Sequence, residues 1–348
     1  MANPRVRVLV VDDSTYQRSS IVKNLGEDQE IEIIGMAFDG LDALDKVQQL
    51  HPDVITLDVE MPRMNGIQAL ERIMVEHPTP VVMLSTLTSE GAEETIKALE
   101  LGAVDFFMKS SVVNPTGSAQ QSNELCEKVK LASKVTRSNL RRQITACPPH
   151  TKKSGTSSTV SVRKIVVIGC STGGPQALSD VLSYLPSDLP APLLVVQHMP
   201  AGLTTYLAKR LNAICAIDVK EACDGDLMKA GEALLAPGDY HLVVNKNSRV
   251  KLDLGPEEWG LRPAVNVTME SVAKSFGHHV LCVIMTGMGS DGTRGAGAVK
   301  ASGGKIFVEH ESTCVVYGMP KSIVEAGAAD KILPRRQLAK EIVLACTE

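Results

Sequence analysis

Two parts of the chain alternate short apolar runs with longer segments of helical spacing. In the first 110 residues, the longer segments repeat apolar residues every three or four positions, as in Leu41, Leu44 and Val47, which is the spacing of one helix face. The short runs are apolar throughout, as expected for strands covered on both sides. Such units predict an α/β domain with a five-stranded parallel sheet, because parallel strands need crossover connections. The predicted strands are Val6–Val11, Ile31–Ala37, Val54–Leu57, Val81–Leu84 and Val104–Met108.

The second alternating pattern begins at Lys164 and predicts another α/β domain with a doubly wound, mostly parallel sheet. Polar residues Asn245–Ser248 separate two short apolar segments, which predicts an antiparallel hairpin inserted in this domain. The expected central strands are Ile165–Ile168, Leu193–Gln197 and Val280–Met285, the expected helices lie near Pro175–Tyr184, Gly202–Leu211 and Pro263–Phe276, and the hairpin strands are His241–Val244 and Arg249–Leu254.

The segment between the two patterns differs in charge from both. Net charge is −11 over residues 1–125, +7 over 126–160 and zero over 161–348. A helix with Leu125, Val129 and Ala132 on one face is predicted, followed by Cys147–Ser161, which has no apolar periodicity and is typical of a linker. We therefore predict domains at 1–122 and 161–348, joined by a basic helix and flexible linker at 123–160. Basic residues here are compatible with nucleic-acid binding, but a solvated linker, or one that docks on the acidic domain, is favoured.

Composition limits the classes of function. The eight cysteines are scattered with no C-x-x-C pair, which argues against a zinc site or a disulfide framework and favours a reducing cytoplasm. No apolar run approaches the eighteen residues of a membrane span, and Asp12 and Asp13 end the first apolar run too early for a signal peptide. The aromatic content of 3% and the zero net charge of residues 161–348 argue against nucleic-acid binding. We expect a cytoplasmic protein without membrane insertion.

Polar residues close several strands of the first predicted sheet. Asp12 and Asp13 follow its first strand, and Asp58 follows the third. The carboxyl ends of parallel strands meet at one edge of the sheet, so these carboxylates should converge and need a hard cation such as Mg²⁺. Each residue alone could be a turn former or a solvated side chain, but together with Ser85 and Lys109, which end the fourth and fifth strands, they predict a polar pocket.

Three residues in the second domain also lie at or just after strand ends. Ser171 stands in Gly169–Pro175, between a strand and a helix, where free N–H groups favour negative charge. Two interpretations compete locally, a phosphate cradle and an exposed nucleophile. The first lacks a Walker lysine, and the next strand ends in His198 where an acidic ribose ligand would stand. Asp291 lies in a Gly-rich loop after a third strand. Each residue alone has a structural explanation, but their joint placement favours a Ser-His-Asp nucleophilic site.

The first domain resembles response-regulator receiver domains, which are flavodoxin-like. The resemblance rests on Val10–Ser14, Leu57–Gly66 and Gly102–Lys109. It implies that Asp58 accepts a phosphoryl group from a chemotaxis histidine kinase. It also implies roles for the surrounding residues. Mg²⁺ is held by Asp13, Asp58 and the Glu60 carbonyl, with Asp12 acting indirectly. Ser85 and Lys109 contact the phosphoryl oxygens, and Phe106 is the switch aromatic residue. Receiver domains usually have a proline directly after the lysine of the fifth strand, whereas Lys109 is followed here by Ser110.

The whole chain resembles chemotaxis protein-glutamate methylesterases, through the segments around Ser171, His198 and Asp291 and through Leu235–Gly238, Arg262–Pro263 and Cys314–Pro320. This resemblance implies hydrolysis of glutamyl methyl esters on methyl-accepting chemoreceptors, with deamidation of receptor glutamines as a weaker expectation and no cofactor for the ester reaction. Ser171 is the implied nucleophile, His198 the base, Asp291 its orienting partner, and the Met288 backbone N–H an oxyanion donor. The unphosphorylated receiver is implied to obstruct the site. The family's Arg-Pro-Ser-Val-Asp segment corresponds to residues 262–266 of this chain, where Ala264 stands in place of the serine and Asn266 in place of the aspartate.

Two rival classes are a non-enzymatic signalling module and a receiver-controlled transcription factor. A module whose second domain only binds receptors or a nucleotide would not react with a serine-directed fluorophosphonate. A transcription factor needs a basic recognition helix, which residues 161–348 do not offer.

Overall fold

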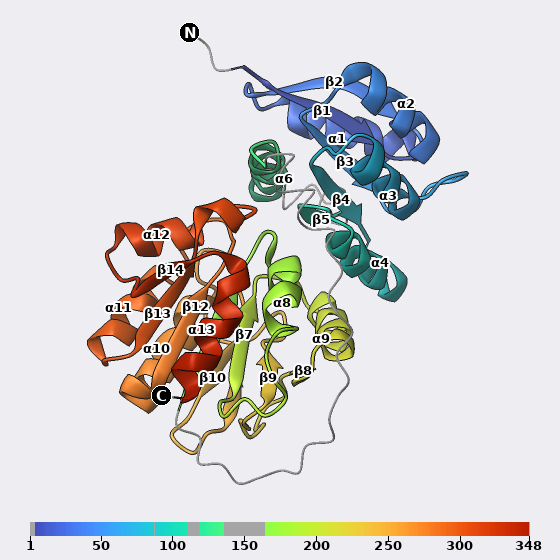
Figure 1. Ribbon diagram of the computed structural model, residues 1–348. Coiled ribbons are helices and arrows are strands. Elements are labelled where there is room, and N and C mark those ends of the chain that lie inside the picture. Colours follow the sequence, from blue (N-terminus) through green and yellow to red (C-terminus); the bar gives the residue numbers. More distant parts are fainter. Residues whose placement is uncertain (1–3, 87, 110–117, 136–163, 348) are drawn as a thin grey trace. The chain divides into compact units, whose positions relative to one another are not determined.

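The structure is a computed structural model that describes residues 4–86, 88–109, 118–135 and 164–347 (Figure 1). The chain divides into two compact units, Met1–Thr145 and Ala146–Glu348. The predicted linker Cys147–Ser161 and the departure at Ser110 lie outside the described residues. Across the parts that are described, no helix has the length and apolar character to cross a membrane.

The first unit is a parallel sheet with helices between its strands, as predicted. Its strand order is β2-β1-β3-β4-β5, and every neighbouring pair runs parallel. The elements are β1 (Val6–Val11), α1 (Thr15–Gly26), β2 (Ile31–Ala37), α2 (Gly40–Leu50), β3 (Val54–Asp58), α3 (Gly66–Glu76), β4 (Val81–Ser85), α4 (Ser89–Glu100), β5 (Asp105–Met108) and α6 (Ser118–Ala132).

The strand order of the first unit has a switch point between β1 and β3. The chain leaves β1 toward one edge of the sheet and leaves β3 toward the other, which opens a crevice at their carboxyl ends. Asp12 directly follows β1, and Asp58 is the last residue of β3. The fold therefore brings these two residues to the place where parallel sheets bind ligands.

Helix α6 belongs to the first unit. The predicted helix face is confirmed, because Leu125, Val129 and Ala132 are all fully buried, and α6 contacts α1 and the strands β3, β4 and β5. The predicted boundary at residue 122 falls inside this helix.

The second unit contains a parallel sheet and a separate antiparallel hairpin, again as predicted, and the sheet has seven strands. The sheet order is β14-β13-β12-β6-β7-β9-β8, and the hairpin pairs His241 with Asp253 and Val244 with Val250. The elements are β6 (Ile165–Cys170), α8 (Gly174–Leu182), β7 (Leu193–Gln197), α9 (Leu203–Ile214), β8 (Asp218–Glu221), β9 (Glu232–Leu235), β10 (His241–Val244), β11 (Val250–Asp253), α10 (Val265–Phe276), η1 (Gly277–His279), β12 (Val280–Ile284), α11 (Thr293–Ala301), β13 (Lys305–Glu309), η2 (Glu311–Thr313), α12 (Met319–Glu325), β14 (Lys331–Leu333) and α13 (Arg335–Thr347).

The handedness of the crossovers distributes the helices of the second unit over two faces. The chain passes from β6 to β7 in one direction along the sheet and from β12 to β13 in the opposite direction. Right-handed crossovers therefore put α8 and α11 on opposite faces. In agreement, α8 packs against α9 and α13, whereas α11 packs against α10 and α12 (Figure 1). The switch point lies between the neighbouring strands β6 and β12.

The strands β8, β9, β13 and β14 were not among the predicted central strands. Strand β8 has the sequence DVKE and forms an exposed edge, and β14 has only three residues at the other edge. Edge strands carry polar residues and lack the continuous apolar run of a buried parallel strand. The apolar signal is strong only at the centre of the sheet, where β6, β7 and β12 are buried at every position.

Candidate functional site

The acidic strand ends of the first unit meet a lysine. Lys109 follows β5, and its Nζ lies 3.0 Å from Asp12 Oδ2 and 2.5 Å from Asp58 Oδ2. All three side chains are buried, whereas Asp13 is exposed. Carboxylate oxygens of Asp12, Asp13 and Asp58 lie within 4.8 Å of one another. Three carboxylates at this spacing form an all-oxygen donor set, which suits a hard divalent cation.

The chemistry of Asp58 is set by its burial. Burial raises the pKa of Asp58 to about 6, while the positive charge and hydrogen bond of Lys109 act in the opposite direction and the negative charge of Asp12 raises it further. The backbone N–H of Glu60 also donates to Asp58 Oδ1 over 3.3 Å. A side chain at position 66 would push a Cβ to 1.9 Å from the Asp58 carbonyl oxygen, so only glycine fits against this strand end.

Two other predicted residues of the first unit have partners outside the carboxylate cluster. The Ser85 hydroxyl lies 2.6 Å from the Thr95 hydroxyl of α4 and is buried. Phe106 is also buried, and Lys128 of α6 lies 5.0 Å from its ring centroid and donates to its carbonyl oxygen over 2.8 Å. Both residues therefore connect the strand ends of the sheet to helices that cover it.

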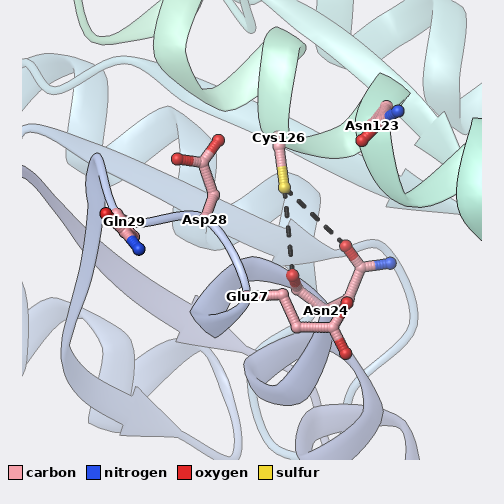
Figure 2. A pocket seen from close by; sticks show the side chains of 6 residues that line it. All are labelled: Asn24, Glu27, Asp28, Gln29, Asn123 and Cys126. Atoms are coloured by element: carbon pink, nitrogen blue, oxygen red, sulfur yellow. Dashed lines mark hydrogen bonds between the residues drawn. The ribbon is translucent and has the colours of Figure 1, made fainter.

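A hollow of about 430 Å³ lies elsewhere in the first unit, where α6 faces the end of α1 (Figure 2). The Cys126 thiol points into it, with Sγ 3.8 Å from Asn24 Oδ1. Burial raises the pKa of this thiol, which lowers its reactivity. The hollow shares no residue with the carboxylate cluster and carries no functional assignment. Its lining is Asn24, Glu27, Asp28, Gln29, Asn123 and Cys126.

In the second unit, Ser171 occupies the turn between β6 and α8. Its N–H donates to the Thr286 carbonyl over 3.0 Å, and its own carbonyl accepts from Gly174 N over 2.7 Å. Gln197 Nε2 donates to the carbonyls of both Ser171 and His198, each over 3.0 Å. These backbone contacts fix the serine at the switch point, with His198 on the neighbouring strand end.

His198 and Asp291 are in direct contact. His198 Nε2 lies 2.7 Å from Asp291 Oδ2, although 93 positions separate the two residues. The carboxylate also accepts backbone N–H groups from Val265 (2.6 Å), Asn266 (2.9 Å) and Gly292 (2.8 Å). Burial alone would raise the pKa of Asp291, but the hydrogen bond and charge of His198 and the backbone N–H groups outweigh it and hold the pKa below its usual range. Asp291 is therefore a carboxylate at neutral pH.

This contact fixes the roles of the two imidazole nitrogens. Asp291 is an acceptor only, so Nε2 of His198 carries the proton. In the neutral ring, Nδ1 then holds the lone pair and is the atom able to take a proton. Within the described residues, no hydrogen bond joins the Ser171 hydroxyl to His198. Such bonds are often long without substrate and tighten when it binds.

The loop after β12 approaches the serine closely. A Cβ at position 287 would lie 2.9 Å from Ser171 Cβ and 2.5 Å from Met319 Sδ, so glycine is needed there. The next residue, Met288, has an exposed side chain, and its backbone N–H donates to no other group in the described part of the chain. A free N–H beside a serine is a suitable donor for a developing oxyanion.

Several residues of this site were not predicted from the sequence. Gln197 is buried in the structure, and its place at the end of an apolar run, directly before His198, is a signal that the sequence offered. The backbone donors Val265 and Asn266 had none, because an N–H group is present at almost every residue. Asn266 also accepts from Gly292 N (3.0 Å) and Gly295 N (2.8 Å) with its side chain. It therefore ties the start of α10 to the loop that carries Asp291.

Comparisons with known proteins agree with this architecture. Residues 8–114 match the family model of the response regulator receiver domain, and residues 166–342 match that of CheB methylesterase. A protein from Symbiobacterium thermophilum is 46% identical over 99% of this chain and 98% of its own length, and one from Geobacillus kaustophilus is 47% identical over 97% and 98%. Both are named protein-glutamate methylesterase/protein-glutamine glutaminase. The solved catalytic domain of the Thermotoga maritima CheB methylesterase is 46% identical, with a TM-score of 0.51, covering 52% of this chain and 97% of that domain.

Fold and matches together define a response regulator whose second domain is of the methylesterase type. The chain belongs to the protein-glutamate methylesterase/protein-glutamine glutaminase family, because it matches curated members along nearly its whole length.

Proposed function

We propose that this chain removes methyl groups from glutamyl methyl esters of chemoreceptors, deamidates receptor glutamines, and is activated by phosphorylation of Asp58. The observation that carries the proposal is the 2.7 Å contact between His198 and Asp291 beside the turn that holds Ser171. The names of relatives that span the whole chain support both activities. We also propose the cytoplasm as the place where the enzyme works.

The proposed reaction is acyl transfer through Ser171. Its hydroxyl oxygen attacks the ester carbonyl carbon while Nδ1 of His198 takes the proton. The Met288 N–H stabilises the negative charge that develops on the carbonyl oxygen. The tetrahedral intermediate collapses, and methanol leaves with the proton from His198. Water then attacks the acyl-enzyme with His198 as base and releases the glutamate carboxylate and free Ser171. A glutamine would release ammonia in the first half of the same reaction.

Asp291 has a supporting role in this mechanism. As a buried carboxylate, it accepts the hydrogen bond from the Nε2–H group throughout and stabilises the imidazolium that forms when Nδ1 is protonated. The protonation state of Asp291 does not change during the reaction. No cofactor is required for these steps.

The proposed control site is the carboxylate cluster of the first unit. A chemotaxis histidine kinase supplies a phosphoryl group to Asp58, and Lys109 pairs with its oxygens after transfer. Asp13, Asp58 and the Glu60 carbonyl would hold Mg²⁺, with Asp12 acting indirectly, and the bound ion would neutralise the carboxylates and the incoming phosphoryl group. Ser85 would bond a phosphoryl oxygen after turning from Thr95, and Phe106 would report this change to the surface of the unit.

The test is labelling of the full chain with a fluorophosphonate, with and without a phosphodonor. We expect stable modification of Ser171, faster in the presence of the phosphodonor and absent in Ser171→Ala. Ser179→Ala is the matched control, because Ser179 bonds the Pro175 carbonyl inside α8 and has no place in the mechanism. A parent chain that stays unlabelled under both conditions would support a binding module and contradict the proposal.

A further inference from the structure

A buried ion pair lies behind the proposed active site, and none of the chemical steps uses it. Glu309 ends β13 and Arg335 begins α13, and both side chains are buried. Glu309 Oε1 lies 2.8 Å from Arg335 Nε. Removing two charges from water is costly, and a buried ion pair is therefore weak evidence for stability. Its contacts indicate a different role.

The second oxygen of Glu309 holds the loop that follows β12. Glu309 Oε2 accepts the N–H of Thr286 over 2.8 Å. The carbonyl of the same Thr286 accepts the N–H of Ser171 over 3.0 Å, and Gly287 and Met288 follow directly in the chain. Thr286 therefore stands between the proposed nucleophile and the proposed oxyanion donor.

The Thr286 hydroxyl is fully used by backbone groups on both sides of the site. It donates to the Thr172 carbonyl over 2.9 Å and accepts from the N–H groups of Val315 (3.1 Å) and Val316 (2.9 Å). One proton and two lone pairs are all that a hydroxyl offers. The side chain is fully buried, so water cannot replace a lost partner.

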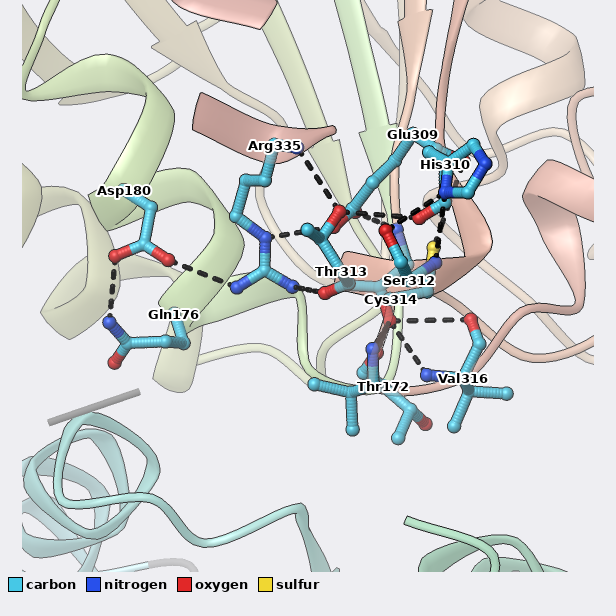
Figure 3. Close-up of polar contacts among 12 residues, drawn as sticks. Thr172, Gln176, Asp180, Glu309, His310, Ser312, Thr313, Cys314, Val316 and Arg335 are labelled. Carbon is cyan, nitrogen blue, oxygen red and sulfur yellow. Dashed lines mark hydrogen bonds and ion pairs between the residues drawn. The ribbon is translucent and has the colours of Figure 1, made fainter. Parts of the chain in front are cut away.

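Arg335 extends the same network to the helix behind the serine. Its guanidinium reaches Asp180 Oδ2 on α8 over 3.0 Å and the Thr313 carbonyl over 2.6 Å (Figure 3). Helix α8 begins three residues after Ser171. The planar fork of arginine holds all three partners in one fixed geometry, which a lysine could not do.

We propose that Thr286, Glu309 and Arg335 are positioning residues that fix the distance between the Ser171 hydroxyl and the Met288 N–H. None of them touches substrate. The inference rests on the proposed function, since it assigns a role in that reaction. Because alignment of the oxyanion donor counts mainly in the transition state, loss of the network should lower kcat and leave KM nearly unchanged.

The decisive comparison is Thr286→Val against Thr286→Ser in the full chain. Valine has the same shape without the hydroxyl, whereas serine keeps it. We expect kcat for methyl ester hydrolysis to fall about 10- to 100-fold in Thr286→Val, less than the roughly 100- to 1000-fold typical of removing an oxyanion donor outright. Thr286→Ser should stay within about threefold of the parent in kcat, and KM should change less than about twofold in both. The rate of Ser171 labelling by a fluorophosphonate should follow kcat.

A second pair of variants tests the charge. Glu309→Gln keeps the shape but leaves Arg335 less compensated, and we expect kcat to fall about tenfold or more with KM unchanged. Glu341→Gln is the matched control, because Glu341 lies on α13, the same helix as Arg335, and pairs at the surface with Lys331 at 2.6 Å. This variant should behave as the parent. If Glu309→Gln does not fold, the comparison of Thr286→Val with Thr286→Ser decides alone.

The outcomes separate the inference from the function on which it rests. A parent chain that hydrolyses no methyl ester contradicts the proposed function. An active parent with Thr286→Val at the parent kcat per labelled serine, even with a lower melting temperature, contradicts the positioning role alone, because a purely structural residue would change stability only.

Discussion

Replacement of Asp291 by asparagine tests the assignment of the histidine nitrogens. Four donors point at the Asp291 carboxylate: His198 Nε2 and Val265 N toward Oδ2, and Asn266 N and Gly292 N toward Oδ1. Asparagine has one acceptor oxygen and a donating NH₂ group. The NH₂ group of the asparagine must therefore face one of these two pairs of donors.

The two orientations of the amide differ in cost. With the NH₂ group toward Asn266 and Gly292, two buried N–H groups lose their acceptor, at about 1–3 kcal/mol each. With the NH₂ group toward Val265 and His198, only the Val265 N–H loses its acceptor, because the imidazole can switch tautomer and accept at Nε2. We expect the second orientation. It places the proton on Nδ1 of His198, the atom that must act as base.

The expected consequence of Asp291→Asn is a large kinetic effect with a small effect on stability. We expect kcat to fall about 1000- to 10,000-fold, as when the wrong histidine tautomer is enforced in other serine hydrolases, while unfolding free energy falls by only about 1–3 kcal/mol. Methanol release gives kcat, and denaturant unfolding gives stability. Asp253→Asn, at an exposed carboxylate of the same unit, is the control. An Asp291→Asn variant within tenfold of the parent kcat would refute the reasoning.

Further predictions concern the close approach at Gly287 and the buried Asp58. Gly287→Ala should lower the rate of Ser171 labelling at least about tenfold, because its Cβ would crowd Ser171; unchanged labelling would contradict the close packing. Asp58→Asn should keep basal ester hydrolysis and lose stimulation by a phosphodonor, measured as methanol release; stimulation equal to the parent's would exclude Asp58 as the acceptor. Burial raises the pKa of Asp58 from its ordinary value of 3.8 to about 6. The stability that the buried Asp58 side chain contributes is therefore fully present below about pH 4 and is lost as pH rises through 6. Without Mg²⁺, Asp58→Asn should therefore match the parent in denaturant unfolding at pH 4 and be more stable on the order of 3 kcal/mol at pH 8; equal stability at pH 8 would contradict the raised pKa.

The central strands and the convergence of their ends could be predicted because both follow from local patterns. Runs such as Val6–Val11 are apolar throughout, and parallel topology forces their carboxyl ends to one edge. This is why Asp12, Asp58 and Lys109 meet in the structure as expected from the sequence.

The supporting contacts could not be predicted, because they depend on exact packing. Thr286 is an ordinary polar residue in a Gly-rich segment, and its three partners are distant in sequence. Arg335 opens a helix with little amphipathic pattern, so nothing local indicates that its side chain is buried beside Glu309. Glu309 does end a buried strand, and a carboxylate at that position is the one signal that could have drawn attention to the network.

Methanol release from methylated chemoreceptor fragments is the most direct test of the central claim. The full chain is compared with Ser171→Ala, each with and without a phosphodonor and Mg²⁺. We predict that the parent releases methanol, that the phosphodonor increases the rate, and that Ser171→Ala releases none under either condition. Methanol release by Ser171→Ala at the parent rate would contradict the account.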